Sequence, residues 1–224
     1  MHIHHVTIGT RDLDATETMY RDTFGFPTTR DGESVVVRMG ATTVAFRAEP
    51  TLSGTHHLAW TIPTGTFDAA VAWASERVPL LLGNGGASVF EAPPTWDARS
   101  VYVDGPDGQL LELIERRALP ASPRGAGFTA DDIVRVSEVG VAVPDVVAAV
   151  DACAAAGVAP YGSAPDPGFS AVGDVDGLLV LVPAERRWFP AHDREPANGA
   201  TTIVADVPRT IELAPGRVLV PRSR

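Results

Sequence analysis

Three stretches of the chain combine a short apolar segment with an amphipathic segment directly after it. In each short segment the apolar residues alternate with polar ones or run together, as in strands. In each amphipathic segment the apolar residues recur every three to four residues, as in helices. The predicted strand and helix pairs are residues 4–9 with 14–24, 56–62 with 67–78, and 138–143 with 146–156. Further strand-like runs with turn residues between them follow each pair, so the pattern predicts a repeated βαβββ module and internal duplication.

The repeats predict an α+β fold in which paired βαβββ modules form a curved, barrel-like mixed sheet, with a third module plus extra strands at the C-terminus. Residues 118–132 include a stretch rich in Pro, Gly, Ala and Ser without periodicity, which is typical of a linker. We therefore expect a two-module domain over residues 1–117. Residues 133–224 are expected to form a degenerate second domain, because residues 191–224 carry short strand-like runs and no helix.

The 224-residue chain is acidic, with 28 Asp and Glu against 18 basic residues and a formal net charge of -10. All 18 basic residues are arginine, which excludes mechanisms that need a lysine amine. The basic pairs at 116–117 and 186–187 are too short to follow a phosphate backbone. We therefore expect no nucleic-acid partner.

Cys153 is the only cysteine, so an intrachain disulfide is excluded and a reducing compartment is favoured. Its helical spacing from Val146, Ala149 and Val150 places the thiol on an apolar face, which predicts a core residue. The N-terminus lacks the basic region of a signal peptide, and the apolar run at 78–82 is too short to span a bilayer. The sequence therefore predicts a soluble cytoplasmic protein with no membrane partner.

Strand alternation places one histidine from each of the first two modules on the face away from its helix. In both strands the apolar residues predicted to face the helix are even-numbered, which leaves His5 and His57 on the opposite face. Glu112 stands in an otherwise apolar run of the second module's last strand, where a charge needs a partner. The three positions lie about one module apart, so we expect them to meet on one concave face. Two imidazoles and one carboxylate with open coordination positions predict a metal site.

Each of these residues alone also fits a structural role. His5 could belong to a frayed N-terminus, His57 could be a hydrogen-bonded core histidine, and Glu112 could be a charge on an edge strand. Their coincidence favours the metal site. In the third module we align Glu138 and Leu181 with His5 and Glu112, so a second complete metal site is not expected and Glu138 is interpreted as a surface or hydrogen-bonded carboxylate.

These features together resemble the vicinal oxygen chelate superfamily, which includes glyoxalase I, fosfomycin- and bleomycin-resistance proteins and extradiol ring-cleaving dioxygenases. The resemblance rests on the βαβββ repeat, on Met-Tyr-Arg-Asp-Thr-Phe-Gly-Phe at 19–26, and on the Asp-Gly-Pro-Asp-Gly turn within 104–115. It covers residues 1 to about 117 well and 133–183 more weakly.

The resemblance implies that His5, His57 and Glu112 bind a divalent metal ion, with Fe(II) or Mn(II) favoured over Zn(II) or Ni(II). It further implies a small-molecule substrate. Tyr102 matches a tyrosine of the extradiol dioxygenases and is expected to act as a catalytic proton donor. Thr7 matches a threonine that contacts substrate in fosfomycin-modifying relatives and is expected to bind substrate.

We therefore expect a metal-dependent enzyme acting on a small oxygen-bearing substrate in a dioxygenase-like or lyase-like reaction. Phe46 stands where glyoxalase I has a fourth metal ligand, which disfavours that isomerisation, and the absence of lysine disfavours a fosfomycin-type transferase. The alternative is a non-catalytic drug- or metabolite-binding protein of the bleomycin-resistance type, which needs no metal. A homodimer is compatible with either function, and the metal content of the protein distinguishes the two.

Overall fold

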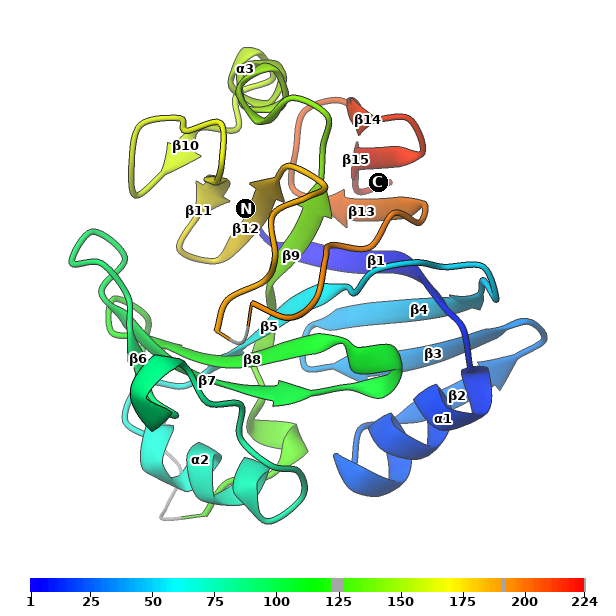
Figure 1. The fold of residues 1–224 in the computed structure, drawn as a ribbon, viewed down its shortest axis with the longest axis vertical. Helices are drawn as coiled ribbons and strands as arrows, with labels where there is room; N and C mark the ends of the chain where they lie inside the picture. The colour runs from blue at the N-terminus through cyan, green and yellow to red at the C-terminus, as the bar shows by residue number, and fades with distance from the viewer. Residues whose placement is uncertain (122–126, 191, 224) are drawn as a thin grey trace.

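The computed structural model describes residues 1–121, 127–190 and 192–223, and it contains three complete βαβββ modules followed by three strands (Figure 1). The first module comprises β1 (Ile3–Thr10), α1 (Leu13–Thr18) with the π-helical turn η1 (Met19–Thr23), β2 (Thr28–Asp31), β3 (Ser34–Met39) and β4 (Thr42–Ala48). The second comprises β5 (His57–Ile62), α2 (Phe67–Ser75), β6 (Phe90–Glu91), β7 (Ala98–Asp104) and β8 (Leu110–Arg116). The third comprises β9 (Arg135–Ala142), α3 (Val146–Ala155), β10 (Pro160–Tyr161), β11 (Ser170–Asp174) and β12 (Gly177–Val182). The last strands are β13 (Thr201–Ala205), β14 (Ile211–Ala214) and β15 (Arg217–Pro221), and short 3-10 turns lie at η2 (Asn84–Gly86), η3 (Pro106–Gly108) and η4 (Ala130–Asp132).

The strands form two curled mixed sheets (Figure 1). In each sheet two groups of strands are joined where the first strand of one group pairs with the first strand of the other, β5 with β9 and β1 with β13. The eight-stranded sheet has the order β10-β11-β12-β9-β5-β8-β7-β6 and therefore combines the second and third modules. The seven-stranded sheet has the order β14-β15-β13-β1-β4-β3-β2 and combines the first module with the C-terminal strands. The predicted α+β class with paired βαβββ modules and extra C-terminal strands is confirmed.

The pairing of modules differs from the expected division into residues 1–117 and 133–224. Each sheet contains strands from both sides of the predicted linker 118–132, because β5 pairs with β9 and β1 pairs with β13. Part of that linker, residues 122–126, lies outside the described residues. The first and second modules therefore belong to different sheets, which decides which side chains can meet.

Helix boundaries follow from local capping. Asp12 has extended backbone and its carboxylate accepts hydrogen bonds from the N–H groups of Asp14 and Ala15, which starts α1. Asp145 starts α3 in the same way through Ala148. Gly157 follows α3 with a φ of 84°, a left-handed conformation that favours glycine and ends the helix.

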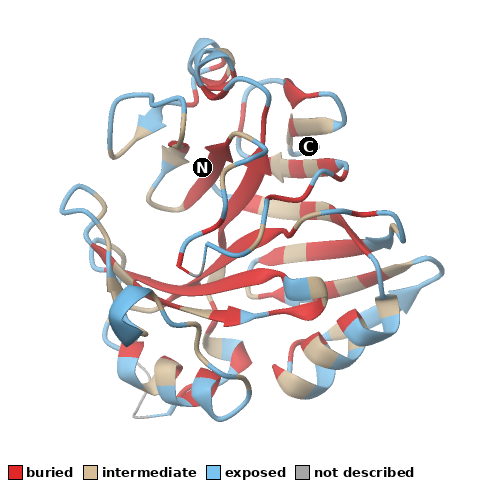
Figure 2. Cartoon of the chain, viewed as in Figure 1, coloured by how far each residue is buried: buried red, intermediate tan, exposed pale blue. Residues whose placement is uncertain are grey.

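One hydrophobic core extends through both sheets. Its largest fully buried side chains include Trp60, Tyr20, Phe24 and Phe46, whose rings stack or meet edge to face. Cys153 lies in the same core, as its helical spacing predicted. Figure 2 shows that β8, β9 and β12 are buried along nearly their whole length, while the helices expose their outer faces. Of the helices in the described ranges, none has the length and hydropathy required to cross a bilayer.

Candidate metal centre

Three buried side chains from adjacent strands meet at the centre of the eight-stranded sheet. They are His57 on β5, Glu112 on β8 and Glu138 on β9, and each offers a ligand atom within 4.8 Å of the others. The Nε2 atom of His57 lies 3.6 Å from Oε2 of Glu112 and 3.8 Å from Oε2 of Glu138. Strand register explains this convergence, because Ala59 on β5 faces Glu112 on one side and Glu138 on the other.

The tautomer of His57 leaves its Nε2 atom able to bind a metal ion. Its Nδ1 atom lies 3.3 Å from the carbonyl oxygen of Leu110, which can only accept, so Nδ1 donates the hydrogen bond. In a neutral ring the lone pair is then on Nε2, directed at Glu112 and Glu138. Although burial opposes the charged ring, hydrogen bonding to Glu138 and the charges of both carboxylates raise the pKa of His57.

The carboxylates of Glu112 and Glu138 lie close together and repel each other, which favours binding of a cation between them. Burial, followed by the charge of Glu138, raises the pKa of Glu112 to about 7, while the charge of His57 opposes the shift. An imidazole and two carboxylates are donors that suit Mn(II), Fe(II) and related divalent ions. The residues therefore fit a metal ion, and without one a proton shared by this cluster reduces the repulsion.

Glu138 is a buried member of the cluster, so of the two roles expected for it the surface role is wrong and the hydrogen-bonded role is confirmed. Its side chain is 5 % exposed and accepts a hydrogen bond from Nη2 of the fully buried Arg116. The guanidinium also lies 5.5 Å from the ring of Trp96 and 5.9 Å from that of Tyr161. The signal that identified Glu112, a carboxylate within an apolar strand, is weaker at Glu138, which follows Ser137 and is the first residue of the predicted strand 138–143.

The structure brings His57 and Glu112 together, but it does not bring His5 or Thr7 to them. His5 and Thr7 lie on β1, in the seven-stranded sheet, and the Nε2 atom of His5 is 3.0 Å from the hydroxyl of Thr7. Burial, together with the charge of Arg47, lowers the pKa of His5. The physical reason is that β5 pairs with β9 of the third module, so Glu138 takes the place predicted for His5.

The fourth strand of the cluster contributes an apolar side chain. Gly140 on β9 faces Val180 on β12, in the same relation that Ala59 has to Glu112. Val180, not the Leu181 that we aligned, is therefore the counterpart of Glu112. The described residues thus supply three candidate ligands, and on the fourth strand Val180 lines the cavity.

Tyr102 lies beside the carboxylates. It faces Glu112 across the β7–β8 pair, and its ring centroid is 6.5 Å from that of His57. Burial and then the charge of Glu112 raise the pKa of the phenol well above its usual value. Hydrogen bonding by Ser100, on the same strand, opposes the upward pKa shifts of both Glu112 and Tyr102. Tyr102 therefore keeps its proton at neutral pH next to the candidate ligands.

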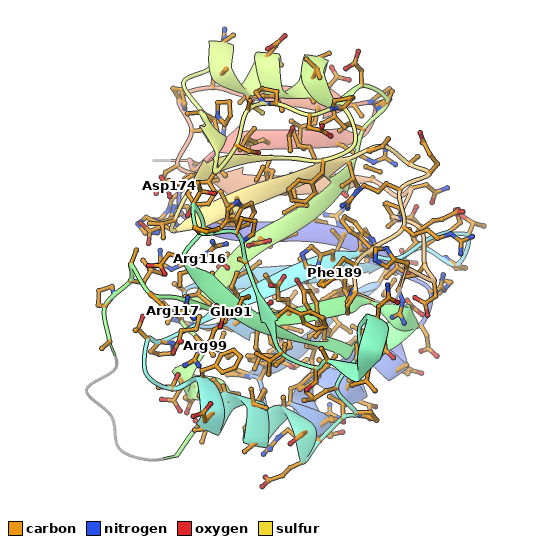
Figure 3. All side chains as sticks on the ribbon, turned by 60° about the vertical axis from the view of Figure 1, so that its left-hand side comes forward. Glu91, Arg99, Arg116, Arg117, Asp174 and Phe189 are labelled. Atoms are coloured by element: carbon orange, nitrogen blue, oxygen red, sulfur yellow. The ribbon has the colours of Figure 1, made fainter. Side chains whose placement is uncertain are left out.

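The cluster opens into a cavity of about 720 Å³ between the second and third modules. Its walls come from β6, β7 and β8, from the segment before β11, and from Arg186, Trp188, Phe189 and His192 of the C-terminal part. In Figure 3, Glu91 and Arg99 lie toward one end of these strands and Phe189 lies toward the other. A cavity of this size is within the range for small molecules.

Trp188 covers the histidine from the C-terminal segment. Its Nε1 atom donates a 2.9 Å hydrogen bond to the carbonyl of Thr55, and its ring centroid lies 5.2 Å from that of His57. Gly140 makes this approach possible, because a Cβ atom there would lie 2.6 Å from Trp188 and 2.9 Å from the Cβ of His57. The absence of a side chain at position 140 therefore lets an aromatic ring shield the cluster from water.

Comparisons with known proteins agree with this architecture. The sequence profile of the Glyoxalase/Bleomycin resistance protein/Dioxygenase superfamily matches residues 2–180, so the chain belongs to that superfamily. No curated protein matches the chain.

Among solved structures, the fold is similar to a putative dioxygenase from Bacillus subtilis subsp. subtilis str. 168, with a TM-score of 0.62, 14% identity, and coverage of 99% of this chain and 84% of the other. It is also similar to glyoxalase I from Zea mays, with a TM-score of 0.53, 18% identity, and coverage of 91% and 74%. At these identities the likeness establishes the fold alone.

Proposed function

We propose that this protein is a metal-dependent enzyme in which His57, Glu112 and Glu138 bind one divalent ion. The observation that carries the proposal is the convergence of three buried ligand atoms within 4.8 Å at the base of a cavity. Buried carboxylates are costly unless they are paired or bind a cation, and Arg116 supplies a single positive charge for two of them. A divalent ion more than offsets the one negative charge that remains.

The ion supplies Lewis-acid or redox chemistry when it is bound, and Fe(II) or Mn(II) suits the donors best, with Zn(II) and Ni(II) as alternatives. The substrate is a small oxygen-bearing molecule, and the reaction is dioxygenase-like or lyase-like. Both reaction types develop negative charge on a substrate oxygen, which a nearby proton donor stabilises. This proposal is supported by superfamily membership and by the cavity that the cluster and Val180 line.

The chain's own residues have separate tasks in this proposal. Tyr102 holds a proton at Oη beside Glu112 and can donate it to a substrate oxygen. Ser100 orients the carboxylate of Glu112, and Arg116 holds one oxygen of Glu138 so that Oε2 faces His57. The ring of Trp188 keeps water from the histidine side.

Metal analysis of untagged protein, purified without a chelating resin, tests the proposal. We expect about one divalent ion per chain in the wild-type protein and a strong loss of the ion in His57→Ala. The matched control is His5→Ala, because His5 occupies the corresponding strand position of the other sheet and the proposal assigns it no ligand role.

Two outcomes contradict the enzyme proposal. A wild-type protein that takes up no ion, and whose melting temperature is unchanged by Fe(II), Mn(II), Zn(II) or a chelator, supports a small-molecule binding protein instead. Equal loss of the ion in His5→Ala and His57→Ala would contradict the assignment of Glu138 as the third ligand.

A further inference from the structure

Among the described residues that line the cavity, one arginine has no carboxylate partner and can bind a ligand. Among the described lining residues, Arg99 is occupied by Glu115 at 2.7 Å, and the exposed Glu91 pairs with Arg117 at 2.8 Å. Arg186 also lines the cavity, and the described residues place no carboxylate within salt-bridge distance of it.

Arg186 is held over an aromatic ring instead of a carboxylate. Its guanidinium carbon lies 5.0 Å from the ring centroid of Phe169, and the side chain is half-buried. Burial lowers the pKa of Arg186, and the more distant Asp166 counteracts that effect. An arginine in this state is partly desolvated, retains its charge, and presents donors that match a carboxylate.

The rest of the cavity wall is largely aromatic. The rings that line it are Phe90, Trp96, Tyr102, Phe169, Trp188 and Phe189. Several meet edge to face, with centroids 4.8 Å apart for Phe90 and Phe189 and 5.7 Å apart for Tyr102 and Phe189. Such walls bind flat apolar groups through stacked or edge-to-face contacts.

We propose that the ligand of this cavity is a small molecule with a flat apolar body and an anionic group, such as a carboxylate, that Arg186 binds. This inference deepens the proposed function and rests on it for the identification of the cavity as the substrate site. The aromatic wall binds the body, and the guanidinium selects the anion. Arg186 is thus a specificity-determining residue, separate from the three candidate ligands.

A pair of matched probes tests the inference: 2-naphthoate, and its neutral counterpart 2-naphthamide. Binding is measured by titration calorimetry with the full chain in EDTA, so that a carboxylate cannot bind to a metal ion. It is then repeated with Mn(II). Quenching of tryptophan fluorescence is a second readout, because Trp96 and Trp188 line the cavity.

We expect wild-type protein in EDTA to bind 2-naphthoate at least about tenfold more tightly than 2-naphthamide, as a charge-assisted hydrogen bond predicts. Arg186→Gln should reduce this preference to within about twofold, and Arg186→Lys should give an intermediate value because it keeps the charge but loses the planar fork. Arg187→Gln is the matched control, since Arg187 is the adjacent exposed arginine and does not line the cavity.

The inference is overturned if wild-type protein binds both probes equally or binds neither. It is also overturned if Arg186→Gln keeps the preference for 2-naphthoate while melting at the same temperature as Arg187→Gln. Failure of the proposed metal site is a separate result, because ion content is measured independently: a protein without an ion that still loses its anion preference in Arg186→Gln supports the inference and contradicts the enzyme proposal.

Discussion

The two sheets have the same pairing scheme, yet they place different chemistry at equivalent positions. In the eight-stranded sheet, Ala59 faces Glu112 on its parallel neighbour and Glu138 on its antiparallel neighbour. Both carboxylates are buried and lie next to His57, two residues earlier on β5.

In the seven-stranded sheet, Thr7 faces Ala45 on its parallel neighbour and Thr202 on its antiparallel neighbour. The histidine two residues earlier, His5, therefore has a methyl group and a hydroxyl where His57 has two carboxylates. His5 has its pKa lowered by burial, whereas the pKa of His57 is raised by its partners. A histidine at the right strand position is thus not sufficient, and the two acidic neighbours distinguish the sheet with a candidate centre.

The largest expected effect comes from replacing Arg116, the buried positive charge that pairs with Glu138 in the eight-stranded sheet. Arg116→Met leaves Glu138 without its partner, so we expect a loss of about 3–5 kcal/mol in the free energy of unfolding, measured by urea denaturation in EDTA. The control is Arg117→Met, whose exposed pair with Glu91 predicts less than about 1 kcal/mol. Equal effects of the two variants would show that burial of Arg116 has no special role.

The comparison of the two sheets is sharpened by changing equivalent residues. Glu138→Gln should weaken Mn(II) binding at least about a hundredfold, because it removes a proposed ligand and not merely an outer partner. Thr202→Val alters the corresponding position of the seven-stranded sheet and should leave the affinity within about twofold. Titration calorimetry measures both affinities, and an unchanged affinity in Glu138→Gln would contradict the assigned centre.

A smaller effect is expected where the C-terminal segment covers the cluster. Gly140→Ala places a Cβ atom in the space of the Trp188 ring, and we expect a destabilisation of about 1–3 kcal/mol from this overpacking. Displacement of the buried ring should shift tryptophan emission to longer wavelength. Trp188→Phe relieves the contact, so the double variant should regain part of the lost stability. No recovery in the double variant would contradict this account.

The smallest effect is expected at the cysteine, which lies away from the cluster. Burial raises the pKa of Cys153 to about 11, so the thiolate fraction stays low until the pH approaches that value. The reaction rate with a disulfide reagent should therefore remain slow between pH 7 and pH 9, where an ordinary cysteine accelerates strongly. Denaturant should restore the ordinary pH profile, and a fast reaction in the native protein would contradict the packing of α3.

Sequence periodicity was sufficient for the modules and for the strand faces. The alternation that set His57 and Glu112 opposite the helices depends only on neighbours in the chain, and the structure brings both residues together. Whether His5 or Glu138 lies beside them depends on which two modules share a sheet. Sequence periodicity cannot predict this pairing, because the first strands of all the modules have similar apolar patterns.

The register of the third module was equally hidden from sequence periodicity. Val180 and Leu181 are both apolar, so alternation cannot distinguish the one that faces the cluster, and the strand pairing of β9 with β12 decides it. The cavity wall formed by Trp188 and Phe189 comes from an irregular segment after β12. Long-range packing of an irregular segment has no periodic signal.

The strands of the eight-stranded sheet lie between the two parts of the seven-stranded sheet along the chain. This arrangement sets the order in which the two sheets can form during synthesis. The strands of the eight-stranded sheet are contiguous in the chain, from β5 to β12, whereas β1 has to wait for β13 near the C-terminus. While the ribosome is still translating the middle of the chain, one edge of β1 has no hydrogen-bonding neighbour, and such edges attract other chains. The eight-stranded sheet, which carries the candidate centre, can thus form before the seven-stranded sheet can be completed. A premature stop ahead of β13 therefore leaves β1 of the first module with an unpaired edge.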